Sequence, residues 1–175
     1  MVGLRTRGGA VVLGSGLVFA QLGCTDPVQE EAILALGPEA PGVAPGPLHR
    51  PGQPCLVCHD GATATPLSVG GTIHRLAEER AVAPFVRVSL VDSRGETFEA
   101  ATNCAGNFFV RPGDYTPEYP MWVTISRGEW QQEMESPVNG DGSCATCHTA
   151  EAGPRSAGRV YLLPFEVGDE ETGCP

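Results

Sequence analysis

Two copies of one pentapeptide carry the residues best suited to chemistry in this chain. They are Cys55-Leu56-Val57-Cys58-His59 and Cys144-Ala145-Thr146-Cys147-His148, which share the pattern Cys-x-x-Cys-His. Thiols at this spacing can add to the two vinyl groups on one edge of a haem, and the His that follows can bind the iron. The pattern predicts two covalent c-type haems. The expected thioether ligands are Cys55, Cys58, Cys144 and Cys147, and the expected proximal iron ligands are His59 and His148.

Two other chemistries use a Cys-x-x-Cys pair. Such a pair can form a redox disulfide or one half of a zinc site. Here a His follows the second Cys directly, which is not the usual spacing of a zinc finger. No βαβ pattern surrounds either copy, as a thioredoxin-like motif would require. Haem attachment is therefore the favoured reading, and zinc or disulfide chemistry remains the alternative.

The sixth ligand of each iron has few candidates. Met134 lies in the polar stretch 131–135 before the second motif, where packing gives little reason for a Met, so it is the favoured ligand. The second iron is its nearest target, and the first is the alternative. His49, before the first motif, and His74, at the end of an expected strand, are the other candidates. Met121 is expected in the core instead. The choice matters because Met/His ligation gives a higher reduction potential than ligation by two histidines. An open sixth position instead allows small molecules to bind the iron.

An export signal is predicted at residues 1–23, ahead of the elements that must position these residues. Two Arg precede the apolar stretch 10–22, which is too short for a comfortable membrane span. Gly23-Cys24 resembles the lipid-attachment site of bacterial lipoproteins, although Gln21 departs from that pattern. We expect a lipid on Cys24; the alternative is an ordinary secretory signal. The expected location is the periplasm or outer membrane, where haem c is also attached.

The charge limits the partners that this chain can bind. It has 11 Arg, no Lys and 21 acidic residues, for a net charge of −10 at pH 7. Nucleic acid is an unfavourable partner because phosphate binding needs a basic surface. A redox partner protein with a basic or neutral docking face is expected. Alternatively, the acidity only keeps the protein soluble.

Two cysteines, Cys104 and Cys174, remain after haem and lipid attachment. An oxidising compartment favours a disulfide between them. Two free thiols are the alternative.

The chain divides into five segments by composition. After the signal, 24–54 is a lipid anchor and a Pro/Gly-rich tether, with a helix at 27–36 capped by Asp26. Residues 55–68 form the first haem segment, 69–135 a β domain, and 136–175 the second haem segment with a short strand at 158–164. Within the β domain, alternation and turn residues predict strands near 69–74, 85–91, 96–102, 107–110 and 121–126.

The β domain resembles the carboxypeptidase regulatory-like or transthyretin-like β-sandwich. The resemblance rests on stretches 71–73, 88–92 with Gly95, 102–108, and Tyr119-Pro120. It implies a mainly β fold, an antiparallel β-sandwich flanked by two loop or short-helix haem sites. The whole order of segments resembles multi-domain cytochrome-like lipoproteins of exported bacterial redox systems.

The favoured function is electron transfer through two covalent haems by a membrane-tethered protein. One alternative is a haem enzyme, peroxidase- or reductase-like, with one open iron. Another is a sensor or binding module that uses the β-sandwich to recognise a partner.

Overall fold

Two antiparallel sheets and one short α-helix make up the described part of the chain. The structure is a computed structural model that describes residues 26–78, 80–162 and 174. The expected mainly β class is confirmed. The elements are α1 (Pro27–Ala35), the 3-10 turn η1 (Cys55–Val57), β1 (Val69–Thr72), β2 (Arg87–Val91), β3 (Thr97–Ala101), β4 (Asn107–Val110), β5 (Trp122–Arg127), β6 (Trp130–Glu133) and the 3-10 turn η2 (Cys144–Thr146).

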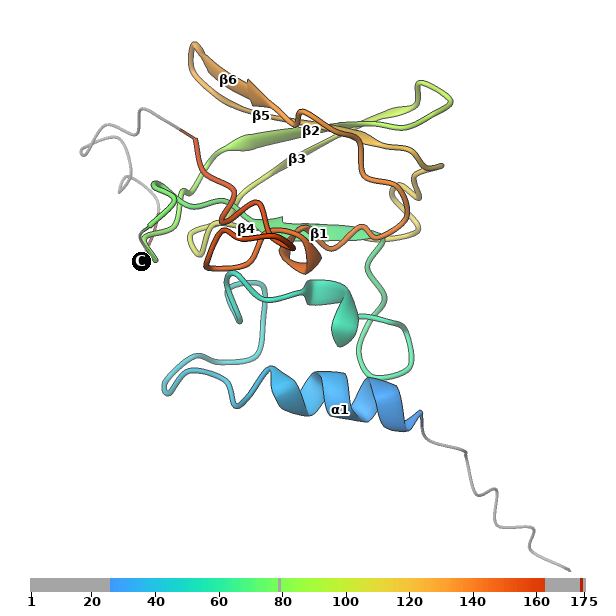
Figure 1. Ribbon diagram of the computed structural model, residues 1–175, viewed down its shortest axis with the longest axis vertical. Coiled ribbons are helices and arrows are strands. Elements are labelled where there is room, and N and C mark those ends of the chain that lie inside the picture. The colour runs from blue at the N-terminus through green and yellow to red at the C-terminus, as the bar shows by residue number, and fades with distance from the viewer. Residues whose placement is uncertain (1–25, 79, 163–173, 175) are drawn as a thin grey trace, which may run out of the picture.

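The strands form one small sheet and one larger sheet. β1 pairs with β4, and the larger sheet has the order β3-β2-β5-β6, with every pairing antiparallel. Figure 1 shows the larger sheet at one end of the molecule and η1 between the smaller sheet and α1. Both 3-10 turns, which carry the two Cys-x-x-Cys-His motifs, contact β1.

The hydrophobic core lies between the two sheets. Val86, Val88 and Leu90 are fully buried, as their alternation predicts, while Arg87 and Ser89 are not. One cluster of buried side chains draws on both sheets and on the segments that join them. Its members are Val69, Ile73, Ala83, Val86, Val88, Leu90, Phe108, Val110, Tyr115, Met121, Ile125 and Leu162. Burial of each large aliphatic side chain contributes about 1.5–3 kcal/mol, so this core stabilises the scaffold that carries both motifs.

Two strands differ from the sequence-based expectation. β6 was not expected, because all four of its residues are exposed and it shows no alternation. It pairs with β5 through a tight turn in which Gly128 has φ +58°. The expected strand at 158–164 is reduced, among the described residues, to a single bridge between Tyr161 and His74. Its last two residues lie outside the described part.

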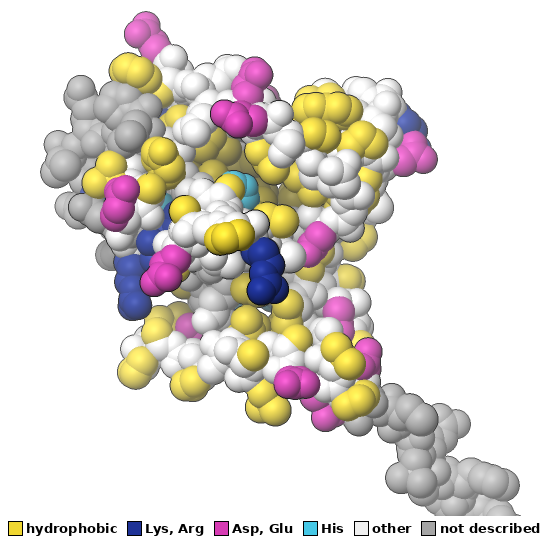
Figure 2. Space-filling model, in the orientation of Figure 1, with side chains coloured by type: hydrophobic (Ala, Val, Ile, Leu, Met, Phe, Trp, Pro, Cys, Tyr) yellow, Lys and Arg dark blue, Asp and Glu magenta, His cyan; other side chains and the backbone are white. Residues whose placement is uncertain are grey.

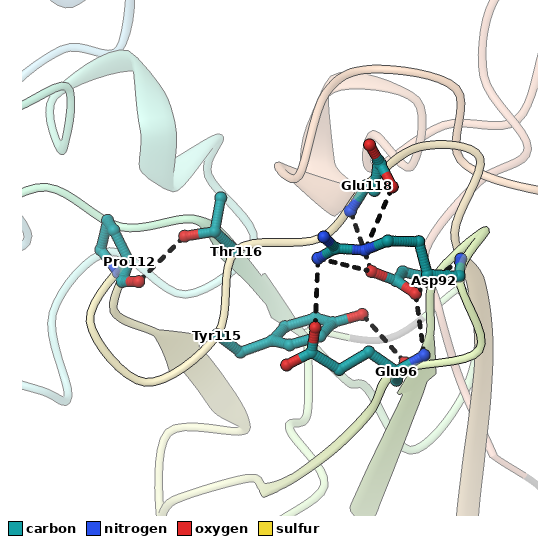
Figure 3. A network of polar contacts seen from close by, with 7 residues as sticks. Asp92, Glu96, Pro112, Tyr115, Thr116 and Glu118 are labelled. Carbon is teal, nitrogen blue, oxygen red and sulfur yellow. Dashed lines mark hydrogen bonds and ion pairs between the residues drawn. The ribbon is translucent and has the colours of Figure 1, made fainter.

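The carboxylate of Asp92 ties the turn after β2 to the loop before β5. It accepts hydrogen bonds from the backbone N–H groups of Arg94 (2.9 Å), Glu96 (2.9 Å) and Glu118 (3.1 Å). Figure 3 shows Asp92 between Glu96 and Glu118. Burial opposes its ionisation, but these three donors and the Arg94 guanidinium hold the pKa of Asp92 below its usual value. The turn and the loop are thereby held in one arrangement.

The N-terminal segment begins with the expected helix. Asp26 caps α1, because its carboxylate accepts from the N–H groups of Val28 (3.0 Å) and Gln29 (3.4 Å). The helix buries no residue, and Figure 2 shows hydrophobic side chains exposed along it. No helix in the described ranges is long and apolar enough to cross a membrane.

The Pro/Gly-rich segment that follows α1 is not an extended tether in the structure. It folds back on α1, because the side chains of Arg50 and Gln53 donate to the carbonyl groups of Gly37 (2.9 Å) and Leu36 (3.1 Å). The Asn107 amide on β4 donates to the His49 carbonyl (2.9 Å). These bonds come from residues distant in the sequence, which composition does not reveal.

Cys104 and Cys174 form a disulfide that closes a sequence separation of 70 residues, with Cα atoms 5.4 Å apart. The bond attaches the C-terminal end to the turn between β3 and β4. The four motif cysteines are free thiols. Cys24 and the expected export signal lie outside the described residues.

Candidate functional site: two Cys-x-x-Cys-His turns

The two motifs adopt the same backbone conformation, although 89 positions separate them. An extended residue, Pro54 or Ser143, precedes each motif, and the first three residues of the motif form a 3-10 turn. The second Cys of each is helical, with φ −100° and ψ −31° at Cys58 and φ −108° and ψ −20° at Cys147. In each, the His N–H bonds to the carbonyl of the first Cys, at 3.0 Å in the first motif and 2.9 Å in the second. The identical turns place equivalent side chains in equivalent positions.

The two motif histidines are also oriented in the same way. The Nδ1 atom of His59 lies 2.7 Å from the Thr65 carbonyl, and that of His148 lies 2.9 Å from the Gly158 carbonyl. A carbonyl oxygen only accepts hydrogen bonds, so each Nδ1 carries the proton. In the neutral form of each ring the lone pair then lies on Nε2. This is the arrangement by which proteins orient a histidine that binds a metal.

β1 lies between the first cysteines of the two motifs. Gly70 and Gly71 are adjacent in this strand, so side chains at these two positions would point to opposite faces. A Cβ on Gly70 would lie 3.2 Å from the Cys55 sulfur, and one on Gly71 would lie 2.8 Å from the Cys144 sulfur. The second motif is aligned beside the strand by a bond from the Gly70 N–H to the Gly142 carbonyl (2.9 Å). Two glycines thus allow both motifs to approach the same short strand.

The first thiol of each motif is held in its protonated form. Burial is the main cause that raises the pKa of Cys55. Burial, with the nearby Cys55 thiol as the second cause, raises the pKa of Cys144 to about 12. Cys55 contributes because the two thiols lie against adjacent glycines of β1. Cys147, by contrast, is exposed.

A cavity of about 500 Å³ adjoins the first motif. That volume is within the usual range for small-molecule and cofactor sites. Cys55, Cys58 and His59 line one part of it. Much of the remaining wall is apolar and includes Leu36, Pro47, Pro54, Leu67, Phe108 and Phe109. Two cationic side chains, Arg50 and Arg111, also line it, and Arg50 lies 3.6 Å from the Glu39 carboxylate.

The structure brings His49 to this cavity. Its ring lies near that of His59, with the two centroids 5.7 Å apart and the ring planes inclined by 29°. The Nδ1 atom of His49 contacts the Gly46 carbonyl, so Nε2 is the ring nitrogen without this bond, as in His59. Of the three distal ligands expected from the sequence, His49 is the one that lines the cavity of a motif.

The other two candidates lie elsewhere. His74 is 6% exposed, and its Nδ1 atom has no hydrogen-bond partner within the described ranges. Its Nε2 atom faces Gly52, and burial, followed by the charge of Arg159, lowers its pKa. Met134 follows β6, and its N–H bonds to the Val123 carbonyl (3.0 Å) in the larger sheet. No described contact brings Met134 to either motif. Met121 is buried in the core.

Two further observations concern other kinds of site. Within the described ranges, no group of three or more His, Cys, Asp or Glu side chains converges as a metal ion would require. A second hollow, of about 570 Å³, lies at one end of the larger sheet and is lined by Phe85, Arg87, Glu99 and Arg127 among others. It contains no residue of either motif.

Comparison with known proteins finds no match among protein-family models, curated proteins or solved structures. The geometry of the two motifs is therefore the basis for a function.

Proposed function

We propose that this chain is an exported dihaem c-type cytochrome that transfers electrons. The observation that carries this proposal is the repeated turn, in which a Cys-x-x-Cys-His motif twice holds the Nδ1 atom of its His on a backbone carbonyl. A repeated metal-ligand geometry is difficult to explain by packing, because both motifs lie at the edge of the core and both histidines remain partly exposed.

The residues around the first motif suit a haem. Cys55 and Cys58 would form the thioether bonds, and His59 would bind the iron through Nε2. The apolar wall formed by Leu67, Phe108 and others would exclude water from the ring. Arg111 would pair with a haem carboxylate in a chain of net charge −10. When bound, haem supplies one-electron chemistry, because its iron alternates between the ferric and ferrous states.

The second motif would hold a second haem through Cys144, Cys147 and His148. Because Cys55 and Cys144 contact neighbouring glycines of β1, the attached edges of the two cofactors would lie near the two faces of that strand. This arrangement supports electron transfer between the two sites across β1, in addition to exchange with an external partner.

The surrounding features agree with an exported redox protein. The disulfide between Cys104 and Cys174 suits an oxidising compartment. We propose that the two sheets form a sandwich of the carboxypeptidase regulatory-like type, with a lipid on Cys24 that tethers the protein in the periplasm or at the outer membrane. The acidic charge favours a redox partner protein with a basic or neutral face.

The test is the covalent haem content of the chain produced in a host that attaches c-type haem. The intact protein should carry two haems that survive acid–acetone extraction. The variants C58A and C147A should each retain covalent haem at the intact motif only, shown by mass spectrometry of the peptides. Complete extraction of haem from the intact protein, or stoichiometric zinc in its place, would overturn the proposal.

A further inference from the structure

We infer that His49 is the sixth ligand of the first haem iron, which closes that site to external small molecules. This inference rests on the proposed function, because it requires a haem at the first motif. It chooses among the three candidates named from the sequence, of which Met134 was expected chiefly at the second iron. Four features of the structure carry it.

The first feature is the distance between the two rings. An imidazole nitrogen binds a metal at about 2.0–2.1 Å, so two imidazoles on opposite sides of one metal have ring centroids on the order of 6 Å apart. The His49 and His59 centroids are 5.7 Å apart, close to that separation, and the rings are stacked with their planes inclined by 29°. The two rings are thus at a suitable separation, and a rotation out of the stacked arrangement would turn both Nε2 atoms toward one metal.

The second feature is the hydrogen bonding of both rings. Each donates from Nδ1 to a backbone carbonyl, that of Gly46 for His49 and that of Thr65 for His59. In each ring Nδ1 is therefore the hydrogen-bonded nitrogen, and Nε2 is the one left to bind a metal. This hydrogen bond is the usual support of a metal-binding imidazole.

The third feature is the anchoring of the loop that carries His49. The His49 carbonyl accepts from Asn107 Nδ2 (2.9 Å), and Asn107 Oδ1 accepts from Thr72 Oγ1 (2.7 Å). The same Thr72 oxygen accepts from the Gly52 N–H (2.7 Å). Because Thr72 ends β1 and Asn107 begins β4, the loop is fixed to the sheet that the first motif also contacts. A ligand held in advance loses less conformational freedom when it binds.

The fourth feature is the shared cavity. His49 and His59 line the same space of about 500 Å³ as Cys55 and Cys58. His74 does not line it, and Met134 lies in the larger sheet. Within the described ranges, His49 is therefore the candidate placed to reach an iron bound by His59.

The experiment uses the full chain with the second motif removed, as the variant C144S/C147S. This background isolates the first haem, and its covalent haem content is measured before any spectrum. In this background the reduced haem should be six-coordinate and low-spin, and should not bind carbon monoxide. Adding His49→Ala should produce a high-spin form that binds one carbon monoxide per haem. His49→Met should restore a low-spin form at a higher reduction potential, because thioether ligation favours ferrous iron.

A matched control is Met134→Ala in the same background, which should leave the spectrum and the carbon monoxide response unchanged. The inference is overturned if His49→Ala stays low-spin without binding carbon monoxide, or if Met134→Ala causes the change instead. Absence of covalent haem from the C144S/C147S background overturns the proposed function at the first motif. This result is distinct from the two outcomes that overturn the ligand assignment. If C144S/C147S does not fold, the same three substitutions in the intact chain give the answer, because a change should then affect one of two haems.

Discussion

A Cβ on Gly71 would lie 2.8 Å from both the Cβ and the sulfur of Cys144. The second motif therefore packs against a position where only glycine fits. The neighbouring Gly70 has the same relation to Cys55, at a slightly longer 3.2 Å from the sulfur. Two adjacent glycines in one strand thus set how closely the two motifs approach each other.

Gly71→Ala is expected to displace the second motif. The added methyl group would meet Cys144 on one side and the Phe108 ring, 3.0 Å away, on the other. Overpacking of this kind costs about 1–3 kcal/mol, and we expect a loss of that size in urea unfolding. Covalent haem should fall at the second motif and remain at the first. Gly113→Ala is the control, since nothing lies within 4 Å of its added Cβ; equal effects of both substitutions would contradict the prediction.

The two thiols of the second motif should differ in reactivity before haem is attached. Cys144 has a pKa of about 12, so at pH 8 only about one molecule in ten thousand carries its thiolate, which is the reactive form. Cys147 is exposed. In chains produced without haem, the thiol retained in C144S should react with iodoacetamide much faster than the one retained in C147S. The rate for Cys144 should still rise above pH 10; a plateau near neutral pH would show that its thiol is not held in the protonated form.

Asp92→Asn should destabilise the fold in a way that depends on pH. The folded protein lowers the pKa of Asp92, so the charged carboxylate contributes stability above its unfolded pKa of about 3.9. That contribution is lost as the pH falls through the folded value. Urea unfolding should show a lower midpoint for the variant at pH 7 and a smaller difference from the wild type below about pH 3. Glu99→Gln, on an exposed carboxylate of β3, is the control. A difference that does not change with pH would contradict the assignment.

Removal of the disulfide should lower stability without loss of haem. The bond closes a separation of 70 residues, and disulfides of this kind contribute about 2–4 kcal/mol, mainly by restricting the unfolded chain. C104S/C174S should lose about that amount in chemical unfolding, and should keep both covalent haems. Reductant should destabilise the wild type alone, because thioether bonds are not reduced. If reductant affects both proteins alike, another bond is responsible.

Local features of the fold could be predicted because their causes lie close together in the sequence. Asp26 caps α1 through bonds to residues two and three positions ahead, and Val86, Val88 and Leu90 alternate within a single strand. The pairing of Cys104 with Cys174 could be expected by elimination, once the other cysteines had roles.

At the candidate site, reasoning from neighbouring residues identified the motifs but not the residues that the fold brings to them. The sequence alone identified the two motifs, because the chemistry of a Cys-x-x-Cys-His turn needs only five adjacent residues. It favoured Met134 as a distal ligand on its polar surroundings, whereas those surroundings belong to the exposed edge strand β6. It treated the segment around His49 as a tether, since Pro and Gly in a sequence show flexibility but not the bonds that remove it.

The tertiary structure decided which residues meet. His49 faces His59 because Asn107, 58 positions along the chain, holds its carbonyl. The two motifs lie on either side of β1 because Gly70 and Gly71 leave room for Cys55 and Cys144. The sequence by itself determined the reactive groups and the local turns, which depend on neighbouring residues. Their arrangement around a common cavity depends on hydrogen bonds and close packing between distant segments, which form only when the whole chain folds.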